Sequence, residues 1–261
     1  MKFTVNNLRV HIYPNRQQLG MAAAGEAGRC IRELLAGQPE VNMIFAAAAS
    51  QNEFLEALVQ EPGIDWQRVR AFHMDEYRGL PPSHPQRFGN FLHKKVFGKV
   101  PFKQVFYLNE SGSDDEQECA RYAGLLEQHK TDITCMGIGE NTHLAFNDPH
   151  VANFHDPELV KLVDLDEACR QQQVHDGCFS SLVEVPSHAY TLTIPALLHA
   201  DHIFCMVPGK NKAPAVRHTL TEAVSERYPS TSLREHSHAL LFLDRDSAGE
   251  LPATYPAYQD S

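Results

Sequence analysis

The sequence lacks several features that mark common classes of protein. None of its apolar runs is long enough to cross a membrane, and its first residues, MKFTVNNLRVHIYP, lack the apolar stretch of a signal peptide. Basic residues are scarce as well: 23 Lys and Arg stand against 33 Asp and Glu, a formal charge of −10. This charge argues against a general nucleic-acid or anionic-membrane binder. We therefore expect a cytoplasmic protein with no nucleic-acid and no membrane partner.

Disulfide and metal-binding patterns are also missing. The six cysteines are scattered without a CxxC pair, and the 15 histidines form no HExxH motif. In a chain of this length without a secretory signal, such cysteines are expected to be reduced thiols. The tightest spacing, Cys169 to Cys178 with His175 between them, is wider than that of usual zinc-ligand pairs. The sequence therefore predicts no metal site.

Short β-rich runs alternate with amphipathic helical stretches, the pattern of a largely parallel α/β sheet. The predicted strands are mostly apolar, as expected where helices cover both faces of the sheet; they are Val41–Ala46, Val69–Met74, Ile133–Ile138, Ala189–Ile194, His202–Val207 and Ala239–Leu243. An apolar stripe from Leu19 to Leu35 predicts a helix with Gly37 as its C-cap. Because no repeat or linker interrupts the pattern, we predict a single Rossmann-like domain over residues 1–261.

Two capping boxes predict helix starts. Ser113 with Glu116 precedes one apolar helical stripe, and Ser50 with Glu53 precedes another. The second start coincides with the end of a predicted strand.

Three polar segments follow predicted strands, namely AAAASQNE after the first, DEYRGL after the second and GENTHLAFNDP after the third. Ligands of open α/β sheets bind beyond the carboxyl ends of the strands. The sequence therefore predicts a binding site where these three segments meet.

Asp75 and Glu76 stand at the tip of a predicted buried strand. Moving a proton between neighbouring sugar carbons requires a base that can take the proton and return it. A carboxylate partly shielded from water suits this task, because desolvation raises its pKa towards the working pH. The alternative is that the two acids merely cap or hydrate a loop.

His143 follows the paired glycines Gly137 and Gly139, which allow a tight turn where a strand leaves the sheet. Glu140 and Asp148 lie in the same loop, and either carboxylate could orient the imidazole ring and fix its tautomer. Such a histidine could open a sugar ring by shuttling a proton. The alternative is a polar loop histidine bonded to the main chain.

A phosphate seat is predicted where Ser50 meets a helix start, because main-chain amides and a hydroxyl suit an anion there. Serine is also simply a preferred helix cap. Lys210 and Lys212, in the segment VPGKNKAP, and Arg170 are further cations that could neutralise a phosphate or remain solvated.

Two of these segments resemble the glucosamine-6-phosphate deaminase/isomerase family, and the similarity runs over nearly the whole chain. MDEYRGLPPSHPQRF resembles the family's MDEY-x-GLP-x-x-HP-x-S, and GIGENTHLAFNDP resembles GVGNDGHIAFNEP. The resemblance implies Asp75 as the enolisation base, His143 as the ring-opening group and Asp148 as its acid partner. It also implies a phosphate loop at Ala47–Gln51 and a phosphate lysine at Lys212.

The implied reaction converts glucosamine 6-phosphate, or a related 2-amino-hexose 6-phosphate, to fructose 6-phosphate and ammonia, with no metal or organic cofactor. The candidate catalytic residues are Asp75, His143, Asp148, Asn141 and Glu140. The candidate substrate- and phosphate-binding residues are Ala48, Ala49, Ser50, Lys212, Arg170 and Glu76.

Several positions depart from the family pattern. Asn141 replaces an aspartate and cannot carry a proton as a carboxylate does. Thr142 replaces a glycine, and a β-branched residue is poorly suited to positive φ. Ala48 and Ala49 replace two glycines of the phosphate loop, and the family's phosphate arginine has no clean match, which leaves Arg170 as its nearest substitute. We expect either a re-tuned substrate or weakened catalysis.

Other functions stay open on the sequence. A 6-phosphogluconolactonase of the same superfamily would carry a GxGxDGHxxSLFPG loop, which LAFNDP does not match. A plain isomerase without deamination and a non-catalytic sugar-phosphate sensor are the further alternatives. Relatives range from monomers to hexamers, so a homo-oligomer is also left open.

Overall fold

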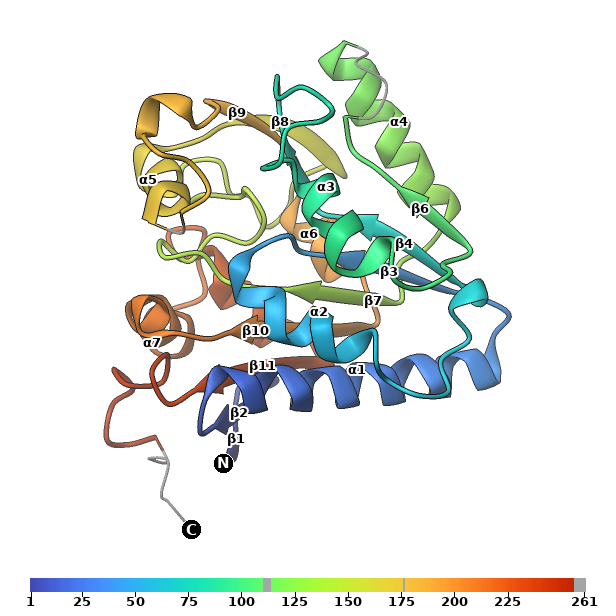
Figure 1. Cartoon of the computed structure of the whole chain (residues 1–261). Coiled ribbons are helices and arrows are strands. Elements are labelled where there is room, and N and C mark those ends of the chain that lie inside the picture. Colours follow the sequence, from blue (N-terminus) through green and yellow to red (C-terminus); the bar gives the residue numbers. More distant parts are fainter. Residues whose placement is uncertain (110–113, 176, 256–261) are drawn as a thin grey trace.

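The computed structural model describes residues 1–109, 114–175 and 177–255 (Figure 1). Within these residues, eight strands form one sheet in the order β1-β2-β11-β10-β7-β3-β4-β6. All neighbours in it are parallel except β1 and β2, which form an antiparallel hairpin. The strands are β1 (Lys2–Val5), β2 (Leu8–Tyr13), β3 (Val41–Phe45), β4 (Val69–His73), β6 (Gln104–Phe106), β7 (Ile133–Met136), β10 (His202–Val207) and β11 (Ala239–Asp244).

A second, antiparallel sheet stands beside the first in the order β5-β9-β8. It contains β5 (Asp75–Tyr77), β8 (Val160–Asp164) and β9 (His188–Leu192). The chain passes from the large sheet to the small one at Met74, whose N–H donates to Phe45 O and whose C=O accepts from Leu192 N. This crossing places Asp75 at the junction of the two sheets.

Helices cover both faces of the large sheet, as predicted (Figure 1). Alternate side chains of a strand point to opposite faces, so Met43 and Phe45 enter one core with α1 and α2 while Ile44 enters the other with α4, α6 and α7. The helices are α1 (Arg16–Gly37), α2 (Asn52–Leu58), α3 (Phe88–Leu92), α4 (Asp115–Gln128), α5 (Glu167–His175), α6 (Ile194–Leu198) and α7 (Ala213–Thr221). None of these helices is both long and apolar enough to span a membrane.

The α/β class and the mainly parallel sheet are confirmed, but one predicted strand lies elsewhere. The run predicted at 189–194 forms β9 of the small antiparallel sheet, not a strand of the parallel one. Gly37 is the last residue of α1 and not its cap, which is Gln38.

The predicted capping boxes are not the ones observed. Ser50 lies inside a 3-10 turn, η1 (Ala49–Gln51), and caps neither this turn nor α2, while Glu53 bonds Arg16. Ser113 lies outside the described residues, and the observed N-cap of α4 is Asp114, whose carboxylate accepts from the main-chain N–H of Glu116.

Candidate active site

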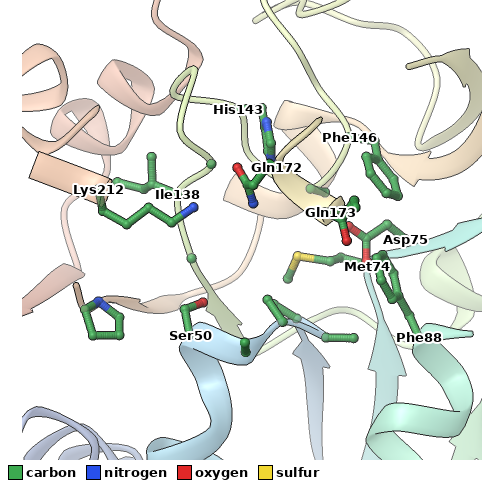
Figure 2. A pocket seen from close by; sticks show the side chains of 18 of the residues that line it. Ser50, Met74, Asp75, Phe88, Ile138, His143, Phe146, Gln172, Gln173 and Lys212 are labelled. Carbon is green, nitrogen blue, oxygen red and sulfur yellow. The ribbon is translucent and has the colours of Figure 1, made fainter. Parts of the chain in front are cut away.

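A cavity of about 790 Å³, its open mouth included, lies where the carboxyl ends of β3, β4, β7 and β10 meet (Figure 2). All three polar segments predicted from the sequence contribute to it, and α5 and the start of α1 complete the wall. The lining residues are Arg16, Ala46, Ala47, Ala48, Ala49, Ser50, Met74, Asp75, Phe88, Gly137, Ile138, Gly139, His143, Ala145, Phe146, Gln172, Gln173, Pro208, Asn211 and Lys212.

The Asp75 side chain is only 7% exposed, and its Oδ1 has no hydrogen-bond partner among the described residues. Burial, with a smaller contribution from the nearby Glu76 charge, raises the pKa of Asp75 well above its ordinary value. The carboxyl group therefore gains a proton more readily than an exposed aspartate, as a group that takes and returns a proton must.

His73 fixes the main chain at Asp75. Its Nδ1 donates to Asp75 O (2.9 Å), and its Nε2 accepts from Leu108 N (2.9 Å). Burial lowers the pKa of His73 to about 4, so the imidazole is neutral at physiological pH and can make both bonds at once.

Glu76 does not reach the cavity, which corrects its prediction as a substrate-binding residue. Neighbouring residues of a strand point to opposite faces, so Glu76 faces away from the cavity that Asp75 lines. Its fully buried carboxylate accepts from the main-chain N–H groups of Tyr77, Phe88 and Gly89, and it pairs with Arg87. Glu76 thus holds the start of α3, not the substrate.

His143 lines the cavity and is oriented from behind by two side chains. Its Nδ1 lies 2.7 Å from Asn141 Oδ1 and 3.0 Å from Asp148 Oδ1. Because Nδ1 is the donor in these contacts, the lone pair of the neutral ring is on Nε2. Gly139 packs so closely on this ring that an added Cβ would overlap it. The prediction of an oriented histidine is therefore supported in its geometry.

Asp148 is fully buried behind His143. Burial by itself would raise the pKa of Asp148, but hydrogen bonds from His143 and Asn141 outweigh it and bring the pKa below its ordinary value. Asp148 is therefore an anion that can stabilise the imidazolium form of His143.

Asn141 bridges two carboxylates. Its Nδ2 donates to Asp148 Oδ1 (2.9 Å) and to Asp166 Oδ2 (3.3 Å), while its Oδ1 faces the His143 ring. It does not line the cavity, so it positions its neighbours and does not transfer a proton. The next residue, Thr142, has the positive φ of +72° expected to be costly for a β-branched residue.

Glu140 orients the loop and not the His143 ring, which corrects its prediction as a catalytic residue. Its main-chain N–H donates to Gln172 Oε1 (2.9 Å), and its Oε1 accepts from Asn211 Nδ2 (2.8 Å). Glu140 thereby ties the 137–149 loop to α5 and to the segment after β10.

Ser50 and the buried Lys212 lie on one side of the cavity, and Asp75, Phe88 and Phe146 lie on the other (Figure 2). The exposed Lys210 does not line the cavity. Ala48 and Ala49 also line the Ser50 side, and neither has positive φ, so alanine fits the loop where the family pattern has glycine.

Arg170 points away from the cavity, which corrects its prediction as a phosphate ligand. Its Nη2 donates to Leu182 O (2.7 Å) and Val185 O (3.0 Å). From the same helix, Gln172 and Gln173 line the cavity instead. They, Arg16 and Asn211 are the polar side chains that sequence reasoning missed.

His143, Asp148 and Cys169 offer ligand atoms within 4.8 Å of one another, as do Asp148, His150 and Asp166. Burial, followed by the charges of Asp148 and Asp166, raises the pKa of the Cys169 thiol. The Cys169 thiol therefore stays protonated beside Asp148. The geometry is that of a hydrogen-bonded support for His143.

Solved structures similar to this chain include a monomeric glucosamine-6-phosphate deaminase, with a TM-score of 0.83 and 28% identity over 92% of this chain and 98% of that one. The 6-phosphogluconolactonase of Thermotoga maritima has a TM-score of 0.73 at 18% identity, over 90% of this chain and 98% of that one. The second likeness shows a shared fold.

Relatives in sequence are named glucosamine-6-phosphate deaminase. The protein of Listeria innocua is 32% identical over 212 residues, 81% of this chain and 88% of that protein. The protein of Bacillus thuringiensis is 32% identical over 222 residues, 85% of this chain and 83% of that protein. A family model for glucosamine-6-phosphate isomerases/6-phosphogluconolactonase matches residues 14–242. The chain therefore belongs to the glucosamine-6-phosphate isomerase/6-phosphogluconolactonase family.

Proposed function

We propose that this protein converts glucosamine 6-phosphate, or a related 2-amino-hexose 6-phosphate, to fructose 6-phosphate and ammonia. The observation that carries the proposal is that Asp75 and His143 line one cavity, in which Ser50 and Lys212 lie on the side across from Asp75. The names of the relatives at 32% identity and of the structure at 28% identity support the same reaction.

The first step assigned to the site is ring opening. His143 Nε2 accepts the proton of the anomeric hydroxyl and returns it to the ring oxygen, which frees the C1 aldehyde. Asp148 stabilises the imidazolium that forms between the two transfers, and Asn141 keeps the ring in place.

Asp75 then carries the isomerisation. Its carboxylate removes the C2 proton to give an enolamine, and the proton is returned to C1, which leaves an imine at C2. Water adds to the imine carbon, and ammonia leaves as the C2 ketone forms. The raised pKa of Asp75 suits this task, since a base and its conjugate acid are both needed within one turnover.

The charges of the cavity fit an amino-sugar phosphate. Among its described lining residues, Asp75 is the one carboxylate, and it lies across the cavity from Lys212. An ammonium group at C2 would lie at the Asp75 side and the 6-phosphate at the Lys212 side. This polarity supports the orientation that the two proton transfers require.

Two further assignments belong to the proposal. Residues 1–261 are taken as one domain, supported by the family match over 14–242. A cytoplasmic location is supported by the absence of any disulfide among the six cysteines, all of which are described.

Lactone hydrolysis is the second candidate, because a histidine oriented by a carboxylate can also activate water. It would require His143 but not Asp75. The two functions therefore differ in which substitution abolishes activity.

The test is ammonia release from 6-phosphates of glucosamine, galactosamine and mannosamine, measured beside hydrolysis of 6-phosphogluconolactone. We expect ammonia from at least one amino sugar, with turnover reduced by about two to four orders of magnitude in Asp75→Asn, the usual scale for a general base. Asp115→Asn, which changes a carboxylate outside the cavity, is the control. Full activity in Asp75→Asn, or lactone hydrolysis without ammonia release, would remove the proposed reaction.

A further inference from the structure

Arg16, the first residue of α1, lines the cavity although no motif marks it in the sequence. We propose that Arg16 is a phosphate-binding residue that shares the substrate's 6-phosphate with Lys212. This inference rests on the proposed function for the choice of sugar phosphate.

The charge of the cavity is the first argument. Among the described residues that line it, Arg16 and Lys212 are the two lysine or arginine side chains. A sugar phosphate carries close to two negative charges at neutral pH. Because Arg170 is turned to main-chain carbonyls, α5 supplies no further cation. Arg16 is the group available to meet the second phosphate charge.

The position of the guanidinium group is the second argument. Arg16 Nη2 donates to Ala49 O (3.1 Å), which places the group beside Ser50 in the predicted phosphate loop. The Glu53 carboxylate accepts hydrogen bonds from Arg16 Nε (2.5 Å) and Nη2 (2.9 Å), which fix one edge of the planar guanidinium group. Nη1 makes no hydrogen bond to any described residue. An oriented guanidinium group with an unused donor is suited to a phosphate oxygen.

The location of Arg16 in its helix is the third argument. The main-chain dipole of a helix disfavours a cation in the first turn, and the first turn of α1 contains no acidic residue. The compensating charge comes from Glu53 on α2. A residue whose charge is unfavourable for its position in a helix often serves a function. A bound anion would interact favourably with both the guanidinium group and the start of α1.

The experiment measures binding without requiring turnover. Calorimetric titrations with fructose 6-phosphate, inorganic phosphate and unphosphorylated glucosamine would compare the wild type with Arg16→Gln, Arg16→Lys and Arg29→Gln. Arg29 is the matched control, because it lies on the same helix and pairs with Glu26 and Glu33 outside the cavity.

We expect Arg16→Gln to weaken binding of both phosphate ligands by roughly ten- to a hundredfold, the scale of a lost hydrogen bond to a charged group. Arg16→Lys should restore part of this affinity, and Arg29→Gln should change it by less than about twofold. Binding of unphosphorylated glucosamine should be unchanged throughout. In turnover, KM should rise while kcat stays nearly constant, because the phosphate does not react.

Equal phosphate affinity in Arg16→Gln and the wild type would overturn the inference and leave the proposed reaction intact. An equal loss of affinity for phosphorylated and unphosphorylated ligands would also overturn it, since that pattern reports a distorted cavity. If phosphate binding depends on Arg16 but no amino sugar releases ammonia, the inference stands and the proposed reaction fails. Unfolding temperatures of each variant, measured alongside, identify any loss of fold.

Discussion

Replacing Asp75 by asparagine should lower turnover by about two to four orders of magnitude and yet stabilise the fold. The Asp75 carboxyl is buried, its Oδ1 has no described partner, and burial with the Glu76 charge raises its pKa well above the ordinary value. In the unfolded chain the same group ionises near pH 4. Above that pH the unfolded state holds fewer protons than the folded state, so the stability contributed by this group falls as the pH rises through the folded pKa.

The size of the effect follows from the unpaired buried group. A buried polar group without a partner costs about 1–3 kcal/mol, and more when it is charged. For a chain of this size, 1 kcal/mol corresponds to roughly 2–4 °C in Tm. We therefore expect Asp75→Asn to unfold about 2–12 °C above the wild type at pH 8, and the gain should shrink towards zero near pH 4.

The assay is thermal unfolding of both proteins from pH 4 to pH 9, with ammonia release measured on the same samples. Asp115→Asn is the control of opposite sign, because the hydrogen bond from Arg78, followed by that from Tyr190, lowers the pKa of Asp115. Asp115→Asn should lower Tm slightly at pH 8 and by less as the pH falls. An Asp75→Asn protein that is less stable at pH 8, or a gain that does not change with pH, would refute the reasoning.

Two further changes test the support of His143, and a third tests the backbone strain beside it. Asp148→Asn removes the anion behind the ring and should lower turnover by about two to four orders of magnitude with little change in KM, measured by steady-state kinetics. Gly139→Ala should displace the His143 ring, because the new Cβ would overlap it, and should lower kcat at least about tenfold. Gly124→Ala is the control, because Gly124 lies at an exposed helix position with open space around it. This control should leave kcat unchanged and raise Tm slightly. Thr142→Gly relieves a positive φ in a β-branched residue and should raise the free energy of unfolding by about 1 kcal/mol in a denaturant titration. A loss of stability would show that contacts of the threonine side chain outweigh the strain of its backbone.

The fold class could be predicted because the central strands leave a clear signal. Their side chains enter two cores, one on each face, so β3 and β10 are apolar at nearly every position. The same signal could not assign β9 to its sheet, because a buried antiparallel strand covered on both faces is equally apolar. Its partners β5 and β8 are decided by contacts between segments far apart in the chain.

Within the site, the ends of the predicted strands were enough to locate the cavity. Predictions that depended on the direction of a single side chain were less successful. Asp75 and Glu76 are neighbours with the same chemistry, and only the alternation of the strand separates the one that faces the cavity from the one that holds α3. Arg170 and the two glutamines after it pose the same problem on a helix, where the phase of α5 relative to the cavity decides which side chain enters it. Arg16 could not be found from local sequence, because its place in the site depends on the packing of α1 against α2.

Asn141 replaces a carboxylate of the family pattern, and the structure accounts for the change through its neighbours. A carboxylate at this position would face Asp148 and Asp166 at the distances where the Nδ2 group of Asn141 now donates to both. Three acids so close together would raise one another's pKa values and weaken the anion behind His143. The amide instead keeps Asp148 charged and still presents an oxygen to His143. The exchange thus removes one proton carrier while preserving the orientation and charge on which the proposed ring opening depends.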